Sequence, residues 1–408
     1  MTCRHCQEPL SLRLIDLGSA PRSNAYLSSE SLRRPESWYP LRVLVCRKCW
    51  LAQTEDFVDA HDLFDSTYAY FSSTSSSWIA HAERYAGTMI DRFGLDRSSH
   101  VVEIASNDGY LLQFFHTRGI PCTGVEPTAS TAAAARAKGI DVIEEFFGTR
   151  LAQQLVSQGR QADLTAANNV LAHVPDINDF TRGFALLLKP AGIATFEFPH
   201  LLRLVAECQF DTIYHEHFSY LSLTAVARVF AANGLHVFDV EHHPTHGGSL
   251  RVFAQRDGDG RQPVSDRVRE VLESEAAAGM RDEAFYGGFQ QKAEKVKDDF
   301  VRFLLDAKRD GHSVAAYGAA AKGNTLLNFA GIRPDLIPFV VDKAAAKQGL
   351  YMPGSRIPVV APSALDTSRP DYLVILPWNI ADEVKQANAH LAARGTKFVT
   401  AVPRLRIA

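Results

Sequence analysis

A strand that ends in an acidic, glycine-containing turn is the feature that most constrains the fold of this chain. The segment Val101–Gly109 has the sequence VVEIASNDG, and a second apolar segment ends in Gly124-Val125-Glu126-Pro127. A glycine in the first strand-to-helix turn of an α/β sheet lets the backbone approach a ligand, and an acid at the end of the next strand can accept hydrogen bonds from both hydroxyls of a ribose. The two segments together predict a parallel sheet with a nucleoside site at its carboxyl edge.

The turn also distinguishes between nucleoside cofactors. A dinucleotide would require the spacing G-x-G-x-x-G, which seats a pyrophosphate on a helix N-terminus and which this turn lacks. Glu103 and Asp108 instead suit the cationic methionine end of S-adenosylmethionine, and they would repel a diphosphate. We therefore expect S-adenosylmethionine as the cofactor, with an ordinary turn and a solvated acid as the alternative. The expected cofactor-binding residues are Glu103, Ser106, Asn107, Asp108, Gly109, Glu126, Pro127 and, at the end of a later strand, Asn169.

Length and composition exclude some classes of protein. The chain has 408 residues, of which 46% are hydrophobic and 22% charged, as is typical of a globular protein with two or three domains. Its formal charge of -3 provides no basic field for a polyanion, so a nucleic-acid partner is not expected. The sequence has no run of about 18 apolar residues, and Cys3 and Cys6 stand where a signal peptide would need its charged and apolar regions. These features predict a cytoplasmic protein without a membrane partner.

Four of the six cysteines form two closely spaced pairs, Cys3-x-x-Cys6 and Cys46-x-x-Cys49. Two such knuckles can converge into the four-thiolate tetrahedron that Zn²⁺ prefers, and four thiolates leave no open position for chemistry. We expect a structural zinc ion here, with a redox pair or unligated thiols as the alternatives. The remaining cysteines are isolated and are expected to be buried apolar residues.

The order of predicted elements divides the chain into three parts. Residues 1–70 are expected to form a zinc-stapled module of short strands, because a domain this small needs such a staple. Residues 71–258 alternate between helix and strand in the manner that builds a parallel sheet with helices on both faces. Residues 259–408 begin with a charged helix and continue as a second, smaller α/β domain. The predicted helices cover residues 78–93 and about 283–310, and the predicted strands cover residues 101–105, 121–126, 163–168, 192–198, 235–241, 249–255, 312–317, 337–341, 372–376 and 398–402.

A short segment between the two α/β parts concentrates titratable side chains. Thr212–Tyr220 contains Tyr214, Glu216 and His217, and such a density is typical of an acid/base centre. Metal binding is not expected, because the order His-Glu-His places neighbouring side chains on different faces of a regular element. A carboxylate such as Glu216 can orient an imidazole and raise its basicity, so the segment predicts a base that acts near neutral pH. Solvated polar residues at the start of a helix are the alternative.

Two further segments contain candidate ligands near the ends of predicted strands. His173 follows Asn168 and Asn169 where a strand ends, and it is either a hydrogen-bond partner for a substrate oxygen or a structural histidine. The segment His246–Arg251, with the sequence HGGSLR, is a more weakly supported candidate for the rim of the same site.

The last part of the chain contains a candidate anion site. Tyr317–Thr325, with the sequence YGAAAKGNT, follows a predicted strand and opens a predicted helix. Such a turn presents backbone N–H groups and a lysine to an anion, although its glycine spacing differs from that of a Walker A loop. We expect Lys322, Gly323 and Asn324 to bind a phosphate or diphosphate, with Arg356 as a second cation. A plain tight turn is the alternative.

Together these pieces resemble the S-adenosylmethionine-dependent sugar C-methyltransferases that act on nucleotide-linked 4-keto-deoxysugars. The resemblance implies an N-terminal zinc-binding domain, a central class I, Rossmann-like methyltransferase domain, and a smaller C-terminal Rossmann-like domain that contributes the nucleotide-sugar site. In these motifs the one departure is Ala105, where methyltransferase turns generally have a glycine. The resemblance spans essentially the whole chain and comprises, in order, the four paired cysteines, Tyr70–Ser73, Glu103–Gly109, Asn169–His173, Tyr214–His217, His246–Arg251 and Tyr317–Asn324.

For the reaction, the resemblance implies methyl transfer to a carbon next to the C4 ketone, expected to be C3, of a dTDP-linked 4-keto-deoxysugar. It maps the acid/base residues onto Tyr214, Glu216 and His217, with His217 as the base. It also implies substrate contacts for His173, Tyr68 and Tyr70. Such a carbon acid needs a base near the carbon and a hydrogen-bond donor near O4, and these residues offer both. We expect a monomer that acts on a small-molecule substrate.

Three other functions share parts of these patterns. An O- or N-methyltransferase would keep the cofactor site without needing a carbon acid. A nucleotide-sugar binding or regulatory protein with a degenerate methyltransferase domain would tolerate loss of Glu216 and His217. A nicotinamide-dependent reductase would be expected to contain G-x-G-x-x-G. The sequence does not distinguish between C3 and C5 or identify the sugar, because that selectivity depends on the shape of the pocket.

Overall fold

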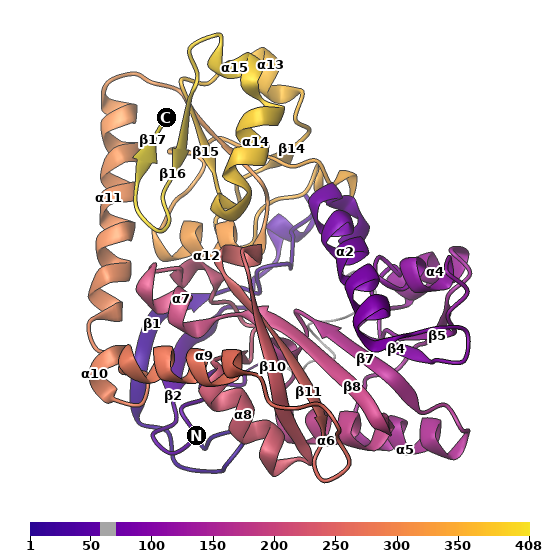
Figure 1. Ribbon diagram of the computed structural model, residues 1–408. Coiled ribbons are helices and arrows are strands. Elements are labelled where there is room, and N and C mark those ends of the chain that lie inside the picture. Colours follow the sequence, from indigo (N-terminus) through magenta and orange to yellow (C-terminus); the bar gives the residue numbers. More distant parts are fainter. Residues whose placement is uncertain (58–70) are drawn as a thin grey trace.

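The computed structural model describes residues 1–57 and 71–408, and the strands of these residues form three sheets. Figure 1 shows a seven-stranded sheet in the lower part, a six-stranded sheet at the top, and a small N-terminal sheet at the lower left. The helix α11 (Phe289–Arg309) runs along one side and spans the lower and upper parts. Tyr68 and Tyr70, two of the predicted substrate-binding residues, lie outside the described residues.

The seven-stranded sheet has the order β10-β11-β8-β7-β4-β5-β6. Neighbours from β8 to β6 are parallel, whereas β11 is antiparallel to β8 and β10. The chain winds outward in both directions from β4, so the carboxyl ends of β4 and β7 form the switch point at which α/β sheets bind ligands. The strands are β4 (Val101–Ile104), β5 (Cys122–Val125), β6 (Asp141–Ile143), β7 (Ala162–Asn168), β8 (Leu188–Pro199), β10 (Leu235–His243) and β11 (Ser249–Arg256).

Helices cover both faces of this sheet because its central strands are apolar on both sides. On one face, α2, α3 and α4 pack through residues such as Tyr85 and Phe115. On the other face, α5, α6 and α8 pack through residues such as Phe184 and Phe230. The helices of this part are α2 (Ser76–Phe93), α3 (Leu112–His116), α4 (Ala129–Ala137), α5 (Thr149–Ser157), α6 (Ile177–Leu187), α7 (Leu201–Ala206), α8 (Leu223–Ala232) and α9 (Asp266–Ala277).

The six-stranded sheet has the order β14-β13-β12-β15-β16-β17. All neighbours are parallel except β16 and β17, so this sheet has its own switch point between β12 and β15. Its strands are β12 (Val314–Tyr317), β13 (Val340–Val341), β14 (Val359–Val360), β15 (Tyr372–Ile375), β16 (Lys397–Thr400) and β17 (Arg406–Ile407). Its helices are α12 (Ala321–Phe329), α13 (Ala364–Ser368), α14 (Ala381–Ala387) and α15 (Ala389–Ala392).

The N-terminal sheet is antiparallel and includes one strand from the middle of the chain. β1 (Leu12–Ala20), β2 (Tyr39–Val45) and β3 (Ala52–Thr54) are consecutive, and β9 (Ser219–Tyr220) pairs with β3. The segment that precedes β9 contains the predicted acid/base residues. The N-terminal sheet is therefore joined directly to that segment.

Most of the predicted elements are present, with shifted ends. The helix predicted at 78–93 begins two residues earlier, because the Ser75 side chain accepts a hydrogen bond from the Trp78 N–H and caps it. The charged helix predicted from about 283 is divided into α10 (Glu283–Tyr286) and α11, since Gly288 adopts a φ of 79° between them. The sequence pattern missed β6, β14 and β17, which are too short to show a period.

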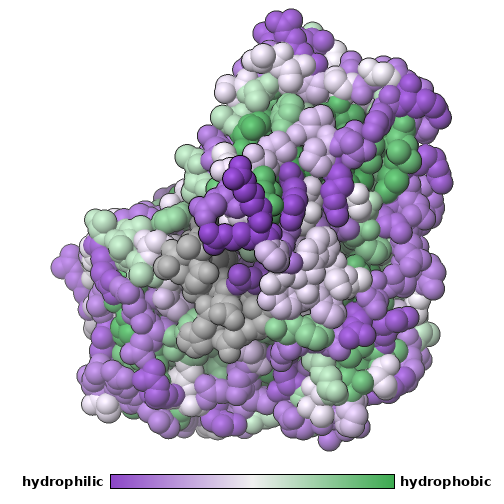
Figure 2. Space-filling model, turned by 180° about the vertical axis from the view of Figure 1, so that it is seen from behind, coloured by the Kyte–Doolittle hydropathy of each residue, from purple (hydrophilic) through white to green (hydrophobic). Residues whose placement is uncertain are grey.

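The face of the molecule opposite to that of Figure 1 has a mixed surface. Figure 2, seen from behind, shows hydrophilic and apolar residues intermixed, with several apolar patches on the upper lobe. Among the helices of residues 1–57 and 71–408, none is both long enough and apolar enough to cross a membrane.

Candidate active site

A cavity of about 1000 Å³ lies where the carboxyl edges of the two parallel sheets meet. The central sheet contributes residues that follow its strands, including Asn107 after β4, Glu126 after β5 and Asn169 after β7. The C-terminal sheet contributes Lys322 and Asn379, which follow β12 and β15. Because α/β sheets bind ligands at these edges, the cavity can hold two ligands, one on each sheet, with their reacting ends between them.

Glu126 is the clearest ligand-binding group on the central sheet. Its carboxylate accepts hydrogen bonds from the backbone N–H groups of Asn107 (2.9 Å) and Thr128 (2.9 Å). The residue is 4% exposed and lines the cavity. A carboxylate has about four lone-pair sites, so Glu126 can still accept two hydroxyl groups. Pro127, also predicted, lines the cavity beside it.

Two asparagines at the end of β7 point to a ligand that donates hydrogen bonds. The side-chain oxygens of Asn168 and Asn169 are buried and have no hydrogen-bond partner in the described part of the chain. Both residues line the cavity. Buried polar atoms are almost always bonded, so these oxygens require a donor such as an ammonium group. With Glu126 as the acceptor for a ribose, the wall fits S-adenosylmethionine.

Four of the predicted cofactor-binding residues do not line the cavity, namely Glu103, Ser106, Asp108 and Gly109. Burial raises the pKa of Glu103 well above its ordinary value. Asp108 lies 3.5 Å from Lys138 and accepts a hydrogen bond from Ser73. Gly109 adopts a φ of 73°, which favours glycine. Glu103 and Asp108 each have one buried carboxylate oxygen without a hydrogen-bond partner in the described part of the chain, as Asn168 and Asn169 have one amide oxygen each. That these carboxylates suit the cationic end of the cofactor stays a prediction.

His217 lies in the cavity wall among other rings. Its ring centroid is 4.0 Å from that of Tyr214 and 4.6 Å from that of His173. Its Nδ1 lies 2.9 Å from the carbonyl oxygen of Thr212, so a neutral ring donates from Nδ1 and keeps its lone pair on Nε2. Burial, together with the nearby His173, lowers the pKa of His217 well below its ordinary value. At neutral pH, the imidazole of His217 is therefore uncharged.

Glu216 contacts a different partner from the expected imidazole. Both of its carboxylate oxygens accept hydrogen bonds from Asn24 Nδ2, at 2.7 and 2.9 Å. Glu216 lies in a turn that is closed by a hydrogen bond from the His217 N–H to the carbonyl oxygen of Tyr214 (2.9 Å), and its carboxylate is directed to Asn24 rather than to His217. Burial raises the pKa of Glu216 to about 7, and the hydrogen bond from Asn24 opposes this rise. His215 lies outside the cavity, 3.2 Å from the carbonyl oxygen of Pro40, and is structural.

Lys322 faces the cavity from the first turn of α12. Its Nζ donates to Asn379 Oδ1 (3.0 Å) and lies 5.1 Å from the centre of the Trp378 ring. The Trp378 ring donates in turn to Asp211 (2.7 Å). Burial lowers the pKa of Lys322 to about 8. An ammonium group at a helix N-terminus is suited to an anion.

Lys347 is a second ammonium group in the cavity wall, and the sequence analysis missed it. Its Nζ donates to the carbonyl oxygen of Ala319 (2.8 Å) and lies 3.9 Å from Asp342, the acid that follows β13. In a dinucleotide-binding sheet this acid would meet a ribose. Here Lys347 lies between the acid and the turn after β12, which counts against a nicotinamide nucleotide at this position.

The other predicted anion-binding residues do not face the cavity. A Cβ at Gly323 would lie 2.8 Å from Cβ of Leu376, so the glycine allows α12 to pack against the end of β15. Asn324 is buried. Arg356 lies 3.9 Å from Glu36 and donates to the carbonyl oxygen of Leu32 (3.4 Å), in the N-terminal module.

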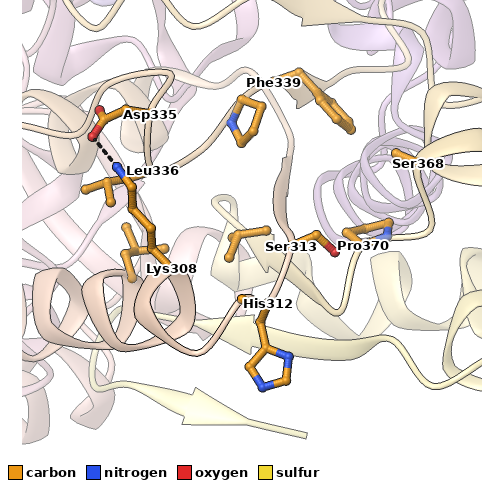
Figure 3. Close-up of a pocket in the computed structure, with 12 residues that line it drawn as sticks. Lys308, His312, Ser313, Asp335, Leu336, Phe339, Ser368 and Pro370 are labelled. Atoms are coloured by element: carbon orange, nitrogen blue, oxygen red, sulfur yellow. Dashed lines mark hydrogen bonds and ion pairs between the residues drawn. The ribbon is translucent and has the colours of Figure 1, made fainter.

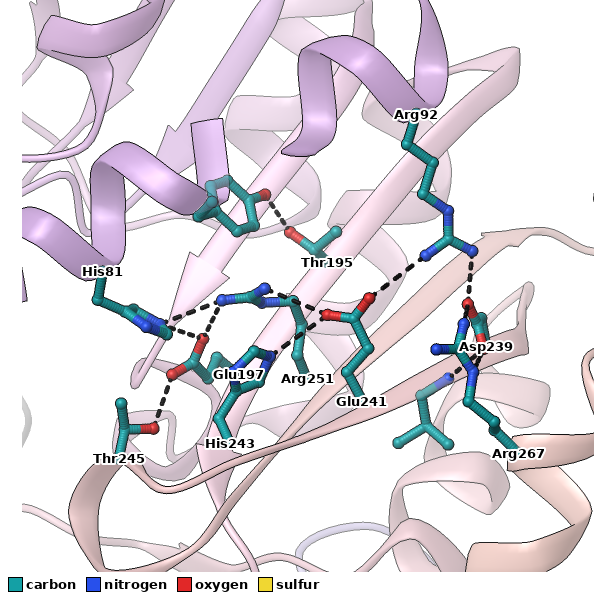
Figure 4. Close-up of polar contacts among 12 residues, drawn as sticks. His81, Arg92, Thr195, Glu197, Asp239, Glu241, His243, Thr245, Arg251 and Arg267 are labelled. Atoms are coloured by element: carbon teal, nitrogen blue, oxygen red, sulfur yellow. Dashed lines mark hydrogen bonds and ion pairs between the residues drawn. The ribbon is translucent and has the colours of Figure 1, made fainter. Parts of the chain in front are cut away.

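Figure 4 shows a network of ionic contacts around the buried side chain of Glu197. Glu197, near the end of β8, accepts a hydrogen bond from Arg251 (2.8 Å) and lies 2.9 Å from His81 Nε2. Thr245 donates to the other carboxylate oxygen (3.0 Å). Burial acts to raise the pKa of Glu197, but His81 and Arg251 together lower it to about 2. The network fixes the turn that begins at Thr245, and this turn places His246 in the cavity wall.

The four paired cysteines converge as predicted. Their sulfur atoms all lie within 4.8 Å of one another. The sulfur atom of Cys3 lies 3.5 Å from that of Cys49, and the sulfur atom of Cys6 lies 3.5 Å from that of Cys46. A tetrahedral Zn²⁺ ion with bonds of about 2.3 Å to sulfur separates its ligands by about 3.8 Å, so the cluster fits zinc. Because all four positions are thiolates, the ion is structural rather than catalytic.

A smaller cavity, of about 320 Å³, lies at the opposite edge of the C-terminal sheet (Figure 3). His312 and Ser313 line it just before β12, and Pro370 lines it just before β15. Lys308, which also lines it, is paired with Asp335 (3.0 Å). Ligands of parallel sheets bind at the carboxyl ends of the strands, so this cavity at the amino ends is not a candidate active site.

Three protein families match successive parts of the chain. Residues 3–64 match a family described as "Putative zinc binding domain", residues 78–240 a "Methyltransferase domain", and residues 244–403 a "C-methyltransferase C-terminal domain". Fold, site and matches thus define an S-adenosylmethionine-dependent C-methyltransferase with a zinc-binding domain. The chain is 34% identical to C-methyltransferase NovU of Streptomyces niveus over 405 aligned residues. The aligned region covers 99% of this chain and 96% of that protein. The chain belongs to this family of C-methyltransferases, and the predicted family, fold and cofactors are confirmed.

Solved structures resemble part of the chain. PH0226 protein from Pyrococcus horikoshii OT3 is 14% identical, with a TM-score of 0.37, over 50% of this chain and 100% of that chain. Magnesium protoporphyrin IX methyltransferase from Synechocystis PCC 6803 with bound SAH is 14% identical, with a TM-score of 0.36, over 44% of this chain and 83% of that chain.

Proposed function

We propose that the protein transfers a methyl group to C3 of a dTDP-linked 4-keto-deoxysugar. The observation that carries this proposal is the uncharged His217 in a cavity with a cofactor wall on one sheet and an ammonium-bearing wall on the other. A C–H group beside a ketone is acidic enough to lose its proton only when a base is positioned at the carbon and the enolate oxygen is stabilised. The position of Lys322 at a helix N-terminus supports a substrate with a diphosphate group.

The chain's own residues would bind the two ligands in separate parts of the cavity. Glu126 would accept the ribose hydroxyls of S-adenosylmethionine, and Asn168 and Asn169 would accept its ammonium group. When bound, this cofactor supplies the electrophilic methyl group that the substrate carbon takes up. Lys322 and Lys347 would hold the diphosphate, which leaves the sugar between the two sheets.

His217 would start the reaction. Its Nε2 removes the proton from C3, and the electron pair of that C–H bond forms the enolate, with its negative charge on O4. Tyr214 or His173 would donate a hydrogen bond to O4. Glu216, held by Asn24, would accept a hydroxyl group of the sugar and fix the ring. The proton passes from His217 Nε2 to solvent, either before the enolate is reprotonated or after the methyl group has been transferred.

Exchange of the C3 proton with D2O tests this mechanism without depending on methyl transfer. The wild-type protein is expected to exchange the C3 proton of the substrate, whereas His217→Asn should lose both exchange and methyl transfer and keep its affinity for S-adenosylmethionine. His312→Asn is a matched control, because His312 is exposed at the opposite edge of the C-terminal sheet. Wild-type turnover in His217→Asn would refute the assignment of His217 as the base. Methyl transfer to an oxygen or nitrogen without C–H exchange would favour the O- or N-methyltransferase.

A further inference from the structure

Arg4 stands between two cysteines of the zinc cluster, yet its side chain reaches the active-site segments. Its backbone N–H donates to Gln53 Oε1 (2.9 Å), and Gln53 Nε2 donates to Cys3 Sγ (3.3 Å). The side chain of Arg4 is 5% exposed. The backbone of Arg4 is therefore fixed by the same knuckle that binds the metal, and its cationic end is buried in the interior.

The guanidinium group contacts both segments that carry the active-site imidazoles. Nη1 donates to the carbonyl oxygen of Pro175 (2.9 Å), two residues after His173. Nη2 donates to the carbonyl oxygen of Thr54 (3.1 Å). Its central carbon lies 5.3 Å from the centre of the Phe218 ring, and Phe218 is the next residue after His217. One buried cation thus connects the two segments.

Strand β3 and the neighbouring knuckle residue reinforce this connection. Thr54 donates from its N–H to the carbonyl oxygen of Phe218 (3.2 Å) and from its hydroxyl to the carbonyl oxygen of His217 (3.0 Å). On the other side, His5 Nδ1 lies 2.8 Å from Asn178 Oδ1, in the first turn of the helix that follows His173. The knuckle therefore docks on both segments whose imidazole rings meet at 4.6 Å.

We propose that Arg4 is a positioning residue that uses the metal-bound knuckle to fix His173 and His217 relative to each other. A four-thiolate site has no open position, so the metal can influence the reaction only through the residues that it holds. Arginine suits this role because its planar fork donates to several acceptors at once. A displacement of about 1 Å in a catalytic group can cost about a hundredfold in rate. The inference rests on the roles proposed above for the two histidines.

The test compares Arg4→Met with Arg47→Met in the zinc-loaded protein. Arg47 follows Cys46 as Arg4 follows Cys3, but its side chain is 44% exposed and is paired with Glu283. Each variant is assayed for zinc content, affinity for S-adenosylmethionine, kcat and KM, and the NMR resonances of the ¹³Cε1-labelled imidazoles of His173 and His217. Arg4→Met is expected to keep the wild-type zinc content and cofactor affinity, to shift both resonances, and to lower kcat by at least about tenfold with a smaller change in KM. Arg4→Lys should recover part of the rate, and Arg47→Met should match the wild type.

The outcomes separate this inference from the proposed function. Unshifted resonances in Arg4→Met would overturn the positioning role. Shifted resonances with a wild-type kcat would support the positioning role and refute the proposed roles of the histidines. If Arg4→Met loses zinc or fails to fold, Arg4→Lys takes its place, because it keeps a cation at this position but lacks the fork that donates to Pro175 and Thr54 at once. Wild-type resonances of both histidines in Arg4→Lys, together with a wild-type kcat, would then overturn the inference.

Discussion

The buried ammonium group of Lys322 should make the affinity for a nucleotide sugar depend on pH. Burial lowers the pKa of Lys322 to about 8. The side chain is then about 90% charged at pH 7 and about 9% charged at pH 9. A bound diphosphate favours the charged form, so the complex remains protonated over this range. The affinity is therefore expected to fall about tenfold from pH 7 to pH 9, which corresponds to about 1.4 kcal/mol.

Calorimetric titration with dTDP-glucose measures this effect, because its diphosphate diester keeps the same charge over the range. Lys322→Arg should bind with nearly equal affinity at the two pH values, since a guanidinium group remains protonated. Lys322→Met should bind weakly at both. A wild-type dissociation constant that is the same at pH 7 and pH 9 would refute the reasoning, as would an undiminished pH dependence in Lys322→Arg.

Three further predictions concern two buried carboxylates and the metal. Asn24→Leu removes the hydrogen bond that opposes the raised pKa of Glu216. The acid limb of the profile of kcat against pH should therefore move to higher pH. An acid limb that does not move would argue against a role for Glu216 in turnover. Glu275→Gln weakens the hydrogen bonds from the backbone N–H groups of Leu223 (2.7 Å) and Thr224 (2.8 Å). At pH 7 it should lower the free energy of unfolding in urea by about 1.5–3 kcal/mol. Burial acts to raise the pKa of Glu275, but the hydrogen bonds from His200 and from the backbone hold it below its ordinary value. The difference in free energy of unfolding between the wild type and Glu275→Gln should therefore shrink as the pH falls through this lowered pKa. A difference that stays constant with pH would contradict the ionic contribution. Chelation of zinc should lower the thermal midpoint and abolish turnover until zinc is restored, and full activity of the metal-free protein would contradict a structural metal.

The sequence was sufficient where function depends on position along a strand or on local spacing. Glu126 and Lys322 follow the ends of parallel strands, and that placement alone brings them to the cavity. The two cysteine pairs have a spacing that permits a tetrahedral cluster, and the cluster is present. In each case a local pattern determines the direction in which the residue points.

The sequence was insufficient where contacts join distant parts of the chain. Asn24 and Glu216 are separated by 192 positions, and neither neighbourhood indicates the other. Lys347 reaches the cavity from a short helix whose residues show no motif. Glu103 has a suitable charge at a suitable place in the sequence, but it lies within β4 and is buried behind the turn. Side-chain direction at such positions depends on tertiary packing, which one sequence does not contain.

The most direct test of the central claim is to identify the atom that receives the methyl group. The purified, zinc-loaded protein is incubated with S-adenosylmethionine that carries a ¹³C-labelled methyl group and with a panel of dTDP-4-keto-deoxysugars. Mass spectrometry detects any product that gains a methyl group, and NMR locates the label. A label bonded to C3, next to the ketone, is the predicted result. A label on oxygen or nitrogen, or unmodified sugars in the presence of bound S-adenosylmethionine, would contradict the proposed reaction.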